Sequence, residues 1–284
     1  MSESGEQTVY APEWLALREP ADAAARSDEL VGLLRDRLAG DAGRTGPAVV
    51  RDLGCGTGSM GRWLAGRLPG PQHWIMHDTD PLLLARAGAT MAGTAADGAP
   101  VSVTTERIDV TALTADVLAG TSLVTASALL DVLTAAEVGA LAAACVAAGC
   151  PALFALSVLG EVDLDPVDPL DAEIRAAFNA HQRRVTGGRR LLGPDAVAVA
   201  TDAFTGRGAT VHVRPSPWRL GPEQAALTVE WLRGWVGAAC EQVPELAGPG
   251  AAYLDRRLTA GAAGRLRVTV GHSDLLALPD GDAS

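Results

Sequence analysis

The chain has 284 residues, 48% of them hydrophobic and 20% charged, which suffices for the core of one large domain. Its net charge is −11, it has no long basic run, and all 23 of its basic residues are arginine. Because nucleic-acid binding depends on cations that neutralise phosphates, we expect no nucleic-acid partner. The lack of lysine also excludes Schiff-base lysines and a Walker-type phosphate-binding lysine.

The sequence carries no sign of a membrane or of an oxidising compartment. We find no basic segment followed by an apolar one at the start, and no run of about twenty apolar residues anywhere. The four cysteines lack C-x-x-C spacing, so they indicate neither a zinc site nor a redox pair. We therefore expect a soluble, cytoplasmic protein without a membrane partner or a metal. Its oligomeric state is not indicated.

Apolar residues at helical spacing predict helices over 11–39, and we assign residues 1–45 to an N-terminal helical cap. From residue 46 to 284, strands alternate with helical segments, a pattern typical of a parallel α/β sheet. A helical insertion over about 160–193, after the fifth strand, is expected to act as a lid. The expected strands are AVVRDL, HWIMHD, VSVTTERID, SLVTASA, PALFALSV, ATVHVRPSPWRL and GRLRVTVGHSDLLALP.

Local signals place the starts of several helices. Asp80-Pro81 combines a capping aspartate with proline at the first helical position. The segment from Thr134 to Glu137 reads as a capping box that opens a helix to about Ala148. Asp168-Pro169 is expected to open a further helix that runs to Val185.

The stretch RDLGCGTGSMG includes the end of the first strand and continues with glycines at 54, 56, 58 and 61. Glycines 56, 58 and 61 match the dinucleotide pattern G-x-G-x-x-G. A strand buried on both faces would then contain Asp52 and Cys55, which is unfavourable. With Gly54 as the first glycine, the strand ends at Leu53 and places Asp52 at its carboxyl end. A carboxylate there can orient the amides of the loop or receive a ligand's ammonium group. Neither role needs a negative charge on the ligand, which suits an amino-acid tail better than a pyrophosphate.

Two further acids end strands. Asp78 follows Gly58 by twenty residues, at the end of the second strand, where a carboxylate can accept hydrogen bonds from both ribose hydroxyls. Both nucleotide classes place an acid there, so Asp78 indicates a nucleoside without choosing between them. Asp109 ends the third strand and is interpreted either as the partner of an adenine amino group or as a plain loop residue.

The series RDLGCGTG, HDTDPLLLARA, RIDV and LVTASALLDVL resembles the motifs of class I S-adenosylmethionine-dependent methyltransferases, over roughly residues 49–158. The resemblance implies a Rossmann-like sheet of seven strands, mostly parallel with one reversed strand, and helices on both faces. It implies S-adenosyl-L-methionine as the cofactor. Neither the Asn-Pro-Pro-Tyr type of motif nor the carboxylates of the metal-dependent catechol branch are present, which favours the branch that methylates small molecules.

Matched position by position, the resemblance implies that the glycines lie along the methionine part of the cofactor, that Asp78 binds ribose, and that Asp109 and Val110 flank adenine. Ser127 would lie near the reacting sulfonium. Arg26 is a further candidate because arginine can pair with the cofactor carboxylate through two donors. The predicted cofactor-binding residues are Asp52, Gly54, Gly56, Gly58, Asp78, Thr79, Asp109, Val110, Ser127 and Arg26.

Methyl transfer mainly requires alignment, and a base is needed only if the acceptor keeps a proton. Asp131 follows the fourth strand closely and is one candidate base. His181 is the other, because Ile174, Phe178, His181 and Val185 would share one face of the expected lid helix. Predicted substrate contacts are Trp14, Arg18 and Phe178. The acidic run over 161–173 is interpreted as a solvated loop before a helix N-terminus.

The sequence thus predicts transfer of a methyl group from S-adenosylmethionine to a small organic acceptor. An NAD-dependent oxidoreductase that uses Gly56 to Gly61 is one alternative. A protein of the same fold that binds the cofactor without methylating is the other. The acceptor itself, and whether oxygen, nitrogen or carbon receives the methyl group, are not indicated.

Overall fold

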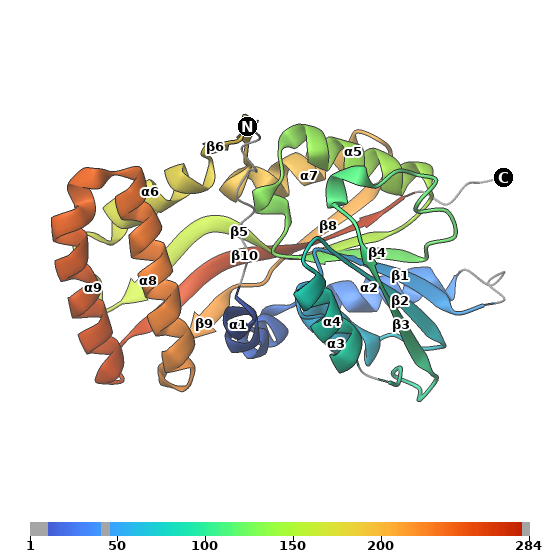
Figure 1. Cartoon of the computed structure of the whole chain (residues 1–284), viewed down its shortest axis with the longest axis horizontal. Helices are drawn as coiled ribbons and strands as arrows, with labels where there is room; N and C mark the ends of the chain where they lie inside the picture. The colour runs from blue at the N-terminus through green and yellow to red at the C-terminus, as the bar shows by residue number, and fades with distance from the viewer. Residues whose placement is uncertain (1–10, 41–45, 92, 280–284) are drawn as a thin grey trace.

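The computed structural model describes residues 11–40, 46–91 and 93–279, so parts of the predicted cap lie outside the described residues. Its centre is one sheet in the order β3-β2-β1-β4-β5-β10-β8, with β9 also paired to β10 (Figure 1). The strands of this sheet are β1 (Ala48–Leu53), β2 (Gln72–Asp78), β3 (Val101–Arg107), β4 (Leu123–Ser127), β5 (Ala152–Asp165), β8 (Thr210–Pro215), β9 (Trp218–Leu220) and β10 (Arg267–Leu278).

The first five strands of the sheet run parallel, and β10 is antiparallel to both β5 and β8. The predicted Rossmann-like sheet with one reversed strand is therefore confirmed. The sheet has eight strands instead of seven because the predicted strand over 209–220 is divided in two. The division falls at Ser216-Pro217, opposite an irregular part of β10, and the Ser216 N–H donates to the His272 carbonyl (2.8 Å). Pro217 lacks an N–H and cannot continue the ladder.

Helices cover both faces of the sheet (Figure 1). Leucines and aromatic residues of α2, α3 and α4 form a core cluster on one face, and α5 and α7 pack on the other. Successive residues of a strand point to opposite faces, as in β5, where Leu153 belongs to the first cluster and Phe154 to the second. The long helices are α1 (Pro12–Ala25), α2 (Asp28–Ala39), α3 (Ser59–Ala65), α4 (Pro81–Thr90), α5 (Ala135–Ala147), α6 (Asp171–Gln182), α7 (Ala196–Thr205), α8 (Ala225–Gln242) and α9 (Ala247–Ala262).

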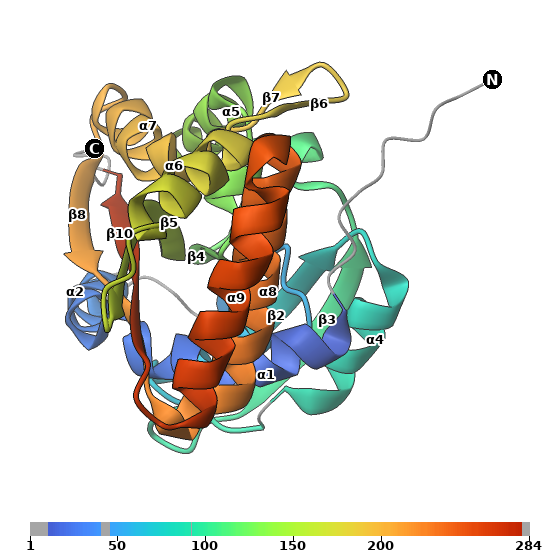
Figure 2. The same ribbon diagram turned by 90° about the vertical axis from the view of Figure 1, so that its left-hand side faces the viewer.

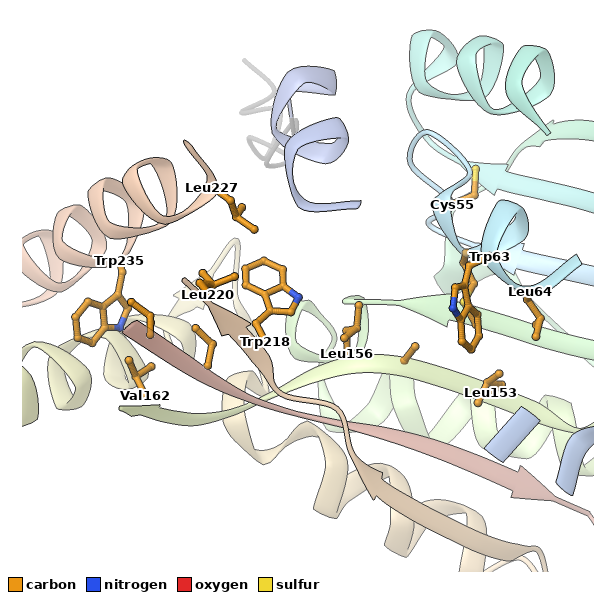
Figure 3. Close-up of a cluster of buried hydrophobic side chains, with 14 of the residues drawn as sticks. Cys55, Trp63, Leu64, Leu153, Leu156, Val162, Trp218, Leu220, Leu227 and Trp235 are labelled. Atoms are coloured by element: carbon orange, nitrogen blue, oxygen red, sulfur yellow. The ribbon is translucent and has the colours of Figure 1, made fainter. Parts of the chain in front are cut away.

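Strand β5 is longer than the sequence suggests. It continues to Asp165, through Gly160 with φ +71°, and pairs with β10 over its whole length. The extended part of this pair carries α6, α8 and α9 at one end of the molecule (Figure 2). One apolar layer joins this end to the rest, and Trp218 lies in it between Trp235 and Trp63 (Figure 3).

Helix α6 was predicted as residues 169–185 and spans Asp171–Gln182, while Val185 lies in the short hairpin β6 (Val185–Thr186) and β7 (Arg189–Arg190). Its buried residue Ile174 packs in the cluster that also holds α8. The start of α6 is fastened to α9, because the Tyr253 hydroxyl donates to Asp171 (2.6 Å) and Arg257 pairs with the same carboxylate. The apolar face of α6 is thus buried against α8 and β5.

A buried carboxylate joins the corner between α1 and α2 to the sheet. Asp274 of β10 accepts hydrogen bonds from the N–H of Ser27, the N-cap of α2, and from the N–H of Leu156 in β5, both at 2.8 Å. Leu156 has φ +57°, a backbone conformation that is uncommon for leucine. The two bonds hold this irregular point of β5 and direct α1 across the carboxyl ends of the parallel strands.

The capping box at the start of α5 is confirmed. Thr134 Oγ1 accepts the Glu137 N–H (3.2 Å), and the Glu137 carboxylate accepts the Thr134 N–H (2.8 Å). We predict that Thr134→Ala lowers the free energy of unfolding by about 1 kcal/mol, because the Glu137 N–H loses its side-chain acceptor while the bond from the residue-134 N–H to Glu137 remains. Urea denaturation measures this, with Thr134→Ser as the control that keeps the hydroxyl. Equal stability of the alanine and wild-type proteins would contradict it.

Candidate functional site

The site lies where the strand order reverses. The chain runs outward in one direction from β1 to β2 and β3, and in the other from β4 to β5, so a crevice opens beyond the carboxyl ends of β1 and β4. A cavity in this crevice is bounded by the glycine loop, by the end of β4 and by α1. Side chains that line it include Leu15, Arg18 and Asp22 of α1, Asp52 of β1 and Ser127 of β4.

The glycine loop begins where the sequence places it, because β1 ends at Leu53. Gly54 and Gly56 have φ of +56° and +54°, in the region where L-residues are strained. Both are also closely covered: a Cβ added at Gly54 would lie 3.1 Å from a Leu129 methyl, and one at Gly56 would lie 3.1 Å from a Leu15 methyl. Both positions therefore require glycine, because φ is positive there and because the Leu129 and Leu15 side chains pack closely against the loop.

Asp52 is a fully buried carboxylate with half of its hydrogen bonding satisfied. Its Oδ1 accepts the Thr125 hydroxyl of the neighbouring strand at 2.7 Å, whereas Oδ2 has no partner among the described residues. Burial raises the pKa of Asp52 to about 7, and the positive charge of Arg26 opposes this shift. An unpartnered buried carboxylate oxygen beside a cavity fits a ligand that brings a hydrogen-bond donor or a positive charge.

Asp78 ties the end of β2 to the glycine loop. One carboxylate oxygen accepts the Gly56 N–H at 2.9 Å and the other accepts the Asp80 N–H at 3.0 Å. Each oxygen keeps a second lone pair, so both can still accept a hydroxyl. Asp80 is the N-cap of α4, as predicted, with its carboxylate on the Leu82 N–H (2.8 Å). The carbonyl of Thr79, between the two acids, accepts a bond from Arg107 (2.9 Å).

Arg26 is buried behind the cavity. Its Nη2 donates to the hydroxyls of Ser59 (3.2 Å) and Ser127 (3.1 Å), and the guanidinium lies 5.4 Å from the centroid of the Trp63 ring. Only 4% of Arg26 is exposed. The structure thus brings two predicted cofactor residues, Arg26 and Ser127, into direct contact.

Asp109 is exposed and caps a single turn, η1 (Val110–Ala112), through bonds from the Thr111 N–H (2.9 Å) and hydroxyl (2.8 Å). Val110 is half-buried beside the second core cluster. Capping therefore accounts for the observed contacts of Asp109, and its role toward adenine stays a prediction.

Asp131 lies in the turn η2 (Leu130–Val132), two residues after the Leu129 side chain that covers Gly54. Its Oδ1 is buried and has no partner within the described part of the chain. Burial raises the pKa of Asp131 to about 6, opposed by the charge of Arg18 on α1. Asp131 is therefore a carboxyl that can change its protonation near neutral pH, although it does not line the cavity at the glycine loop.

His181 and Phe178 lie on α6, and neither lines the cavity at the glycine loop. His181 Nε2 is 3.2 Å from the Glu241 carboxylate of α8, and Nδ1 is 3.2 Å from an Arg184 nitrogen. Burial lowers the pKa of His181. Phe178 and Trp14 pack against the first core cluster. The structure gives His181 one partner just beyond the end of its own helix and one on α8, and its catalytic role remains an untested prediction.

Several cavity residues were missed. Asp22 and Leu15 line the cavity from α1, and Ser59 and Met60 line it from α3. The signal for Asp22 was weak, because one acid in a helix usually faces solvent; here it is 3% exposed. Cys55 also lines the cavity, and burial raises the pKa of its thiol, so it is no thiolate nucleophile.

Two further features concern metals and membranes. Among residues 11–40, 46–91 and 93–279, no cluster of three or more histidine, cysteine, aspartate or glutamate side chains is arranged to hold a metal ion. In the same part of the chain, no helix combines the length and apolarity needed to cross a membrane.

No protein-family model matches the sequence, and no curated protein matches it. Among solved structures, a cyclopropane synthase of Mycobacterium tuberculosis is 12% identical with a TM-score of 0.48, covering 95% of this chain and 94% of that chain. A SAM-dependent methyltransferase of Geobacter sulfurreducens, in complex with S-adenosyl-L-homocysteine, is 16% identical with a TM-score of 0.42, covering 95% and 98%. Phosphoethanolamine N-methyltransferase 2 of Haemonchus contortus is 11% identical with a TM-score of 0.46, covering 97% of this chain and 60% of that chain.

The burial of Asp52 has a consequence for stability. Its pKa of about 7 exceeds the value near 3.9 of an unfolded chain, so the folded state holds the proton more tightly. The free energy of unfolding therefore falls as the pH rises from about 4 to about 7, because the unfolded chain releases the Asp52 proton more readily than the folded chain. We predict that Asp52→Asn, which cannot ionise but can accept from Thr125, gains stability relative to wild type over that range, by up to about 1.4 kcal/mol per pH unit.

Urea denaturation of both proteins at about pH 5 and pH 8 measures this gain, because all other groups titrate alike in the two chains. A stability difference that stays constant with pH would contradict the assigned burial of the ionised carboxylate.

Proposed function

We propose that this protein transfers a methyl group from S-adenosylmethionine to a small organic acceptor. The observation that carries the proposal is the unpartnered buried oxygen of Asp52 beside the glycine loop, at the point where the strand order reverses. An ammonium group would supply the missing partner and also favour the ionised carboxylate. The amino-acid tail of S-adenosylmethionine carries such a group, whereas the pyrophosphate of a dinucleotide would add negative charge next to Asp52.

The remaining residues fit a nucleoside with that tail. Asp78 would accept the two ribose hydroxyls through its free lone pairs, while its existing bonds to the Gly56 and Asp80 N–H groups keep it oriented. Gly54 and Gly56, with φ of +56° and +54°, let the loop turn tightly beside the cavity that would hold the ligand. Ser127, held by Arg26, would lie beside the sulfur end. Asp109, Val110 and Thr79 would border the adenine.

S-adenosylmethionine, when bound, supplies an electrophilic methyl group on a sulfonium. The chain's contribution is to fix the positions of donor and acceptor, since in-line displacement depends mainly on alignment. Asp131 would take up the proton of an acceptor that keeps one, because its unpartnered Oδ1 and its pKa of about 6 suit it to hold a proton briefly near neutral pH. Arg18 and Trp14 of α1 would border the acceptor side.

Ligand binding tests the proposal against its alternatives. We predict that S-adenosylhomocysteine raises the melting temperature and that NAD does not, because only a ligand of the native state stabilises it. Methyl-labelled S-adenosylmethionine, incubated with a panel of small alcohols, phenols, amines and carboxylic acids, then shows whether label is transferred. Stabilisation by NAD alone would favour the oxidoreductase. Stabilisation by S-adenosylhomocysteine without transfer to any acceptor, with no small molecule co-purifying, would favour a binding protein.

The ribose assignment has its own test. We predict that Asp78→Ala weakens binding of S-adenosylhomocysteine by about 1.5–3 kcal/mol, because hydrogen bonds from hydroxyls to a charged acceptor are lost. Isothermal titration calorimetry measures the change. Asp78→Ala also removes a bond to a backbone N–H, that of Gly56, so a control must lose a neighbouring carboxylate with such a bond but keep the proposed ribose acceptor. Asp80→Ala is this control, because it removes only the cap of α4. An unchanged dissociation constant for Asp78→Ala would refute the ribose role.

A further inference from the structure

A second cavity lies at the start of α5, away from the glycine loop. Its volume is about 510 Å³, within the range of about 300–1,000 Å³ that is typical of small-molecule sites. It is bounded by α5, by the hairpin of β6 and β7 and by the turn η3 (Gly193–Asp195), and Figure 2 shows this hairpin beside α5. We call this cavity the hairpin groove; it is lined by 134–137, 188–192, Arg183 and Asp195. None of these residues lines the cavity at the glycine loop.

The hairpin is held against the start of α5. Gly187 and Gly188 have φ of +57° and +76°, which suits the two-residue turn that reverses β6 into β7. Arg189 of β7 donates through Nε and Nη2 to the Glu137 carboxylate of α5, at 2.9 and 2.7 Å. Beyond β7, the Leu192 N–H donates to the carbonyl of the residue before the N-cap of α5 (2.9 Å). These contacts give the groove a defined shape.

Positive charge exceeds negative charge in the groove. Of its two carboxylates, Glu137 is paired with Arg189. The other, Asp195, accepts from Nε and Nη2 of Arg183, both at 2.7 Å. These arginine partners hold the pKa of both carboxyls below its usual value, so both pairs stay ionised at neutral pH. The third arginine, Arg190, has no side-chain partner among the described residues. One uncompensated positive charge therefore lines the groove.

Two of the arginines keep donors for an anion. Arg189 uses Nε and Nη2 for the bonds already described, and its Nη1 has no partner within the described part of the chain. Arg190 keeps its whole guanidinium, a planar set of donors that matches the oxygens of a carboxylate or a sulfonate. A ligand with one negative charge would balance the groove, whereas a second negative charge would lie beside the two carboxylates.

The rest of the lining is largely apolar. Ala135 and Ala136 border the groove from α5, and Leu191 and Leu192 border it from the segment after β7. An inorganic anion would leave this surface in contact with water. An organic anion would cover it, and removing apolar surface from water favours binding. The groove is thus complementary to an anionic group that is attached to an apolar body.

We propose that the hairpin groove binds a small organic anion with a single charge. The anionic group pairs with Arg190 and with Nη1 of Arg189, and the apolar body contacts Ala136 and Leu191. Binding is recognition only, without a covalent step. Because the groove shares no lining residue with the cavity at the glycine loop, this second site does not depend on the proposed methyl transfer.

Two fluorescent probes with the same rings test the inference. Anilinonaphthalenesulfonate is an aromatic anion with one charge, and phenylnaphthylamine has the same rings without the sulfonate. We predict that the folded protein binds one equivalent of the sulfonate probe and binds the neutral probe more weakly. Inorganic phosphate at matched ionic strength should displace the sulfonate probe poorly, because it lacks an apolar body. An excess of S-adenosylhomocysteine should not displace it, because that ligand belongs to the other cavity.

Three variants locate the probes. Arg190→Gln removes the uncompensated charge and should weaken binding of the sulfonate probe by about 3- to 10-fold, without changing that of the neutral probe. Arg184→Gln is the matched control, because Arg184 lies in the same connection between α6 and η3 but does not line the groove. Ala136→Phe fills the groove from α5 and should weaken both probes. Circular dichroism verifies the fold of each variant.

Several results would overturn the proposal. These are a wild-type protein that binds neither probe, an equal effect of Arg190→Gln and Arg184→Gln, unchanged binding in Ala136→Phe, and displacement by S-adenosylhomocysteine. Displacement by phosphate as strong as by an organic anion such as benzoate would contradict an organic ligand. A loss of the sulfonate probe in Arg190→Gln but not in Arg184→Gln, with both probes weakened in Ala136→Phe, supports the site. Binding of S-adenosylhomocysteine is measured separately, so the proposed function can fail or hold independently of this result.

Discussion

The buried carboxylate of Asp274 positions the elements on which the site depends. A buried carboxylate is costly unless hydrogen bonds satisfy it, and Asp274 is satisfied by the N–H groups of Ser27 and Leu156. Burial nevertheless raises the pKa of Asp274. Since Ser27 directly follows Arg26 and the end of α1, these bonds fix where Arg26 enters the wall and how α1 crosses the glycine loop. The cavity thus depends on a contact made from β10, the last strand in the chain.

Features set by short-range rules could be predicted from the sequence. The end of β1 at Leu53 and the caps at Asp80 and Thr134 follow from residues close together in the chain, whereas the reversed last strand was implied by the family resemblance. The placement of Asp52 and Asp78 beside the same loop followed as well, because the carboxyl ends of neighbouring parallel strands meet at one edge. The geometry of short segments and of parallel strands was sufficient to predict these positions.

Partners distant in sequence could not be predicted. A stripe of apolar residues shows that a helix has a buried face but not what covers it, and α6 packs against α8 and the extended end of β5. The burial of a polar residue on α1 could not be predicted for a similar reason. Asp22 has a role only because Trp218, 196 residues further along, brings an indole N–H to it.

Asp52 shows how a candidate functional residue can be recognised by a folding rule that the chain breaks. A strand buried on both faces favours apolar residues, and a carboxylate there should either be replaced or fully hydrogen-bonded. Thr125 satisfies one oxygen of Asp52 and leaves the other without a partner. Such a defect lowers stability, and it persists where function needs it. Oδ2 of Asp52 has no partner among the described residues, and Asp52 lines the cavity that the glycine loop borders, so a ligand that carries an ammonium group would complete its hydrogen bonding.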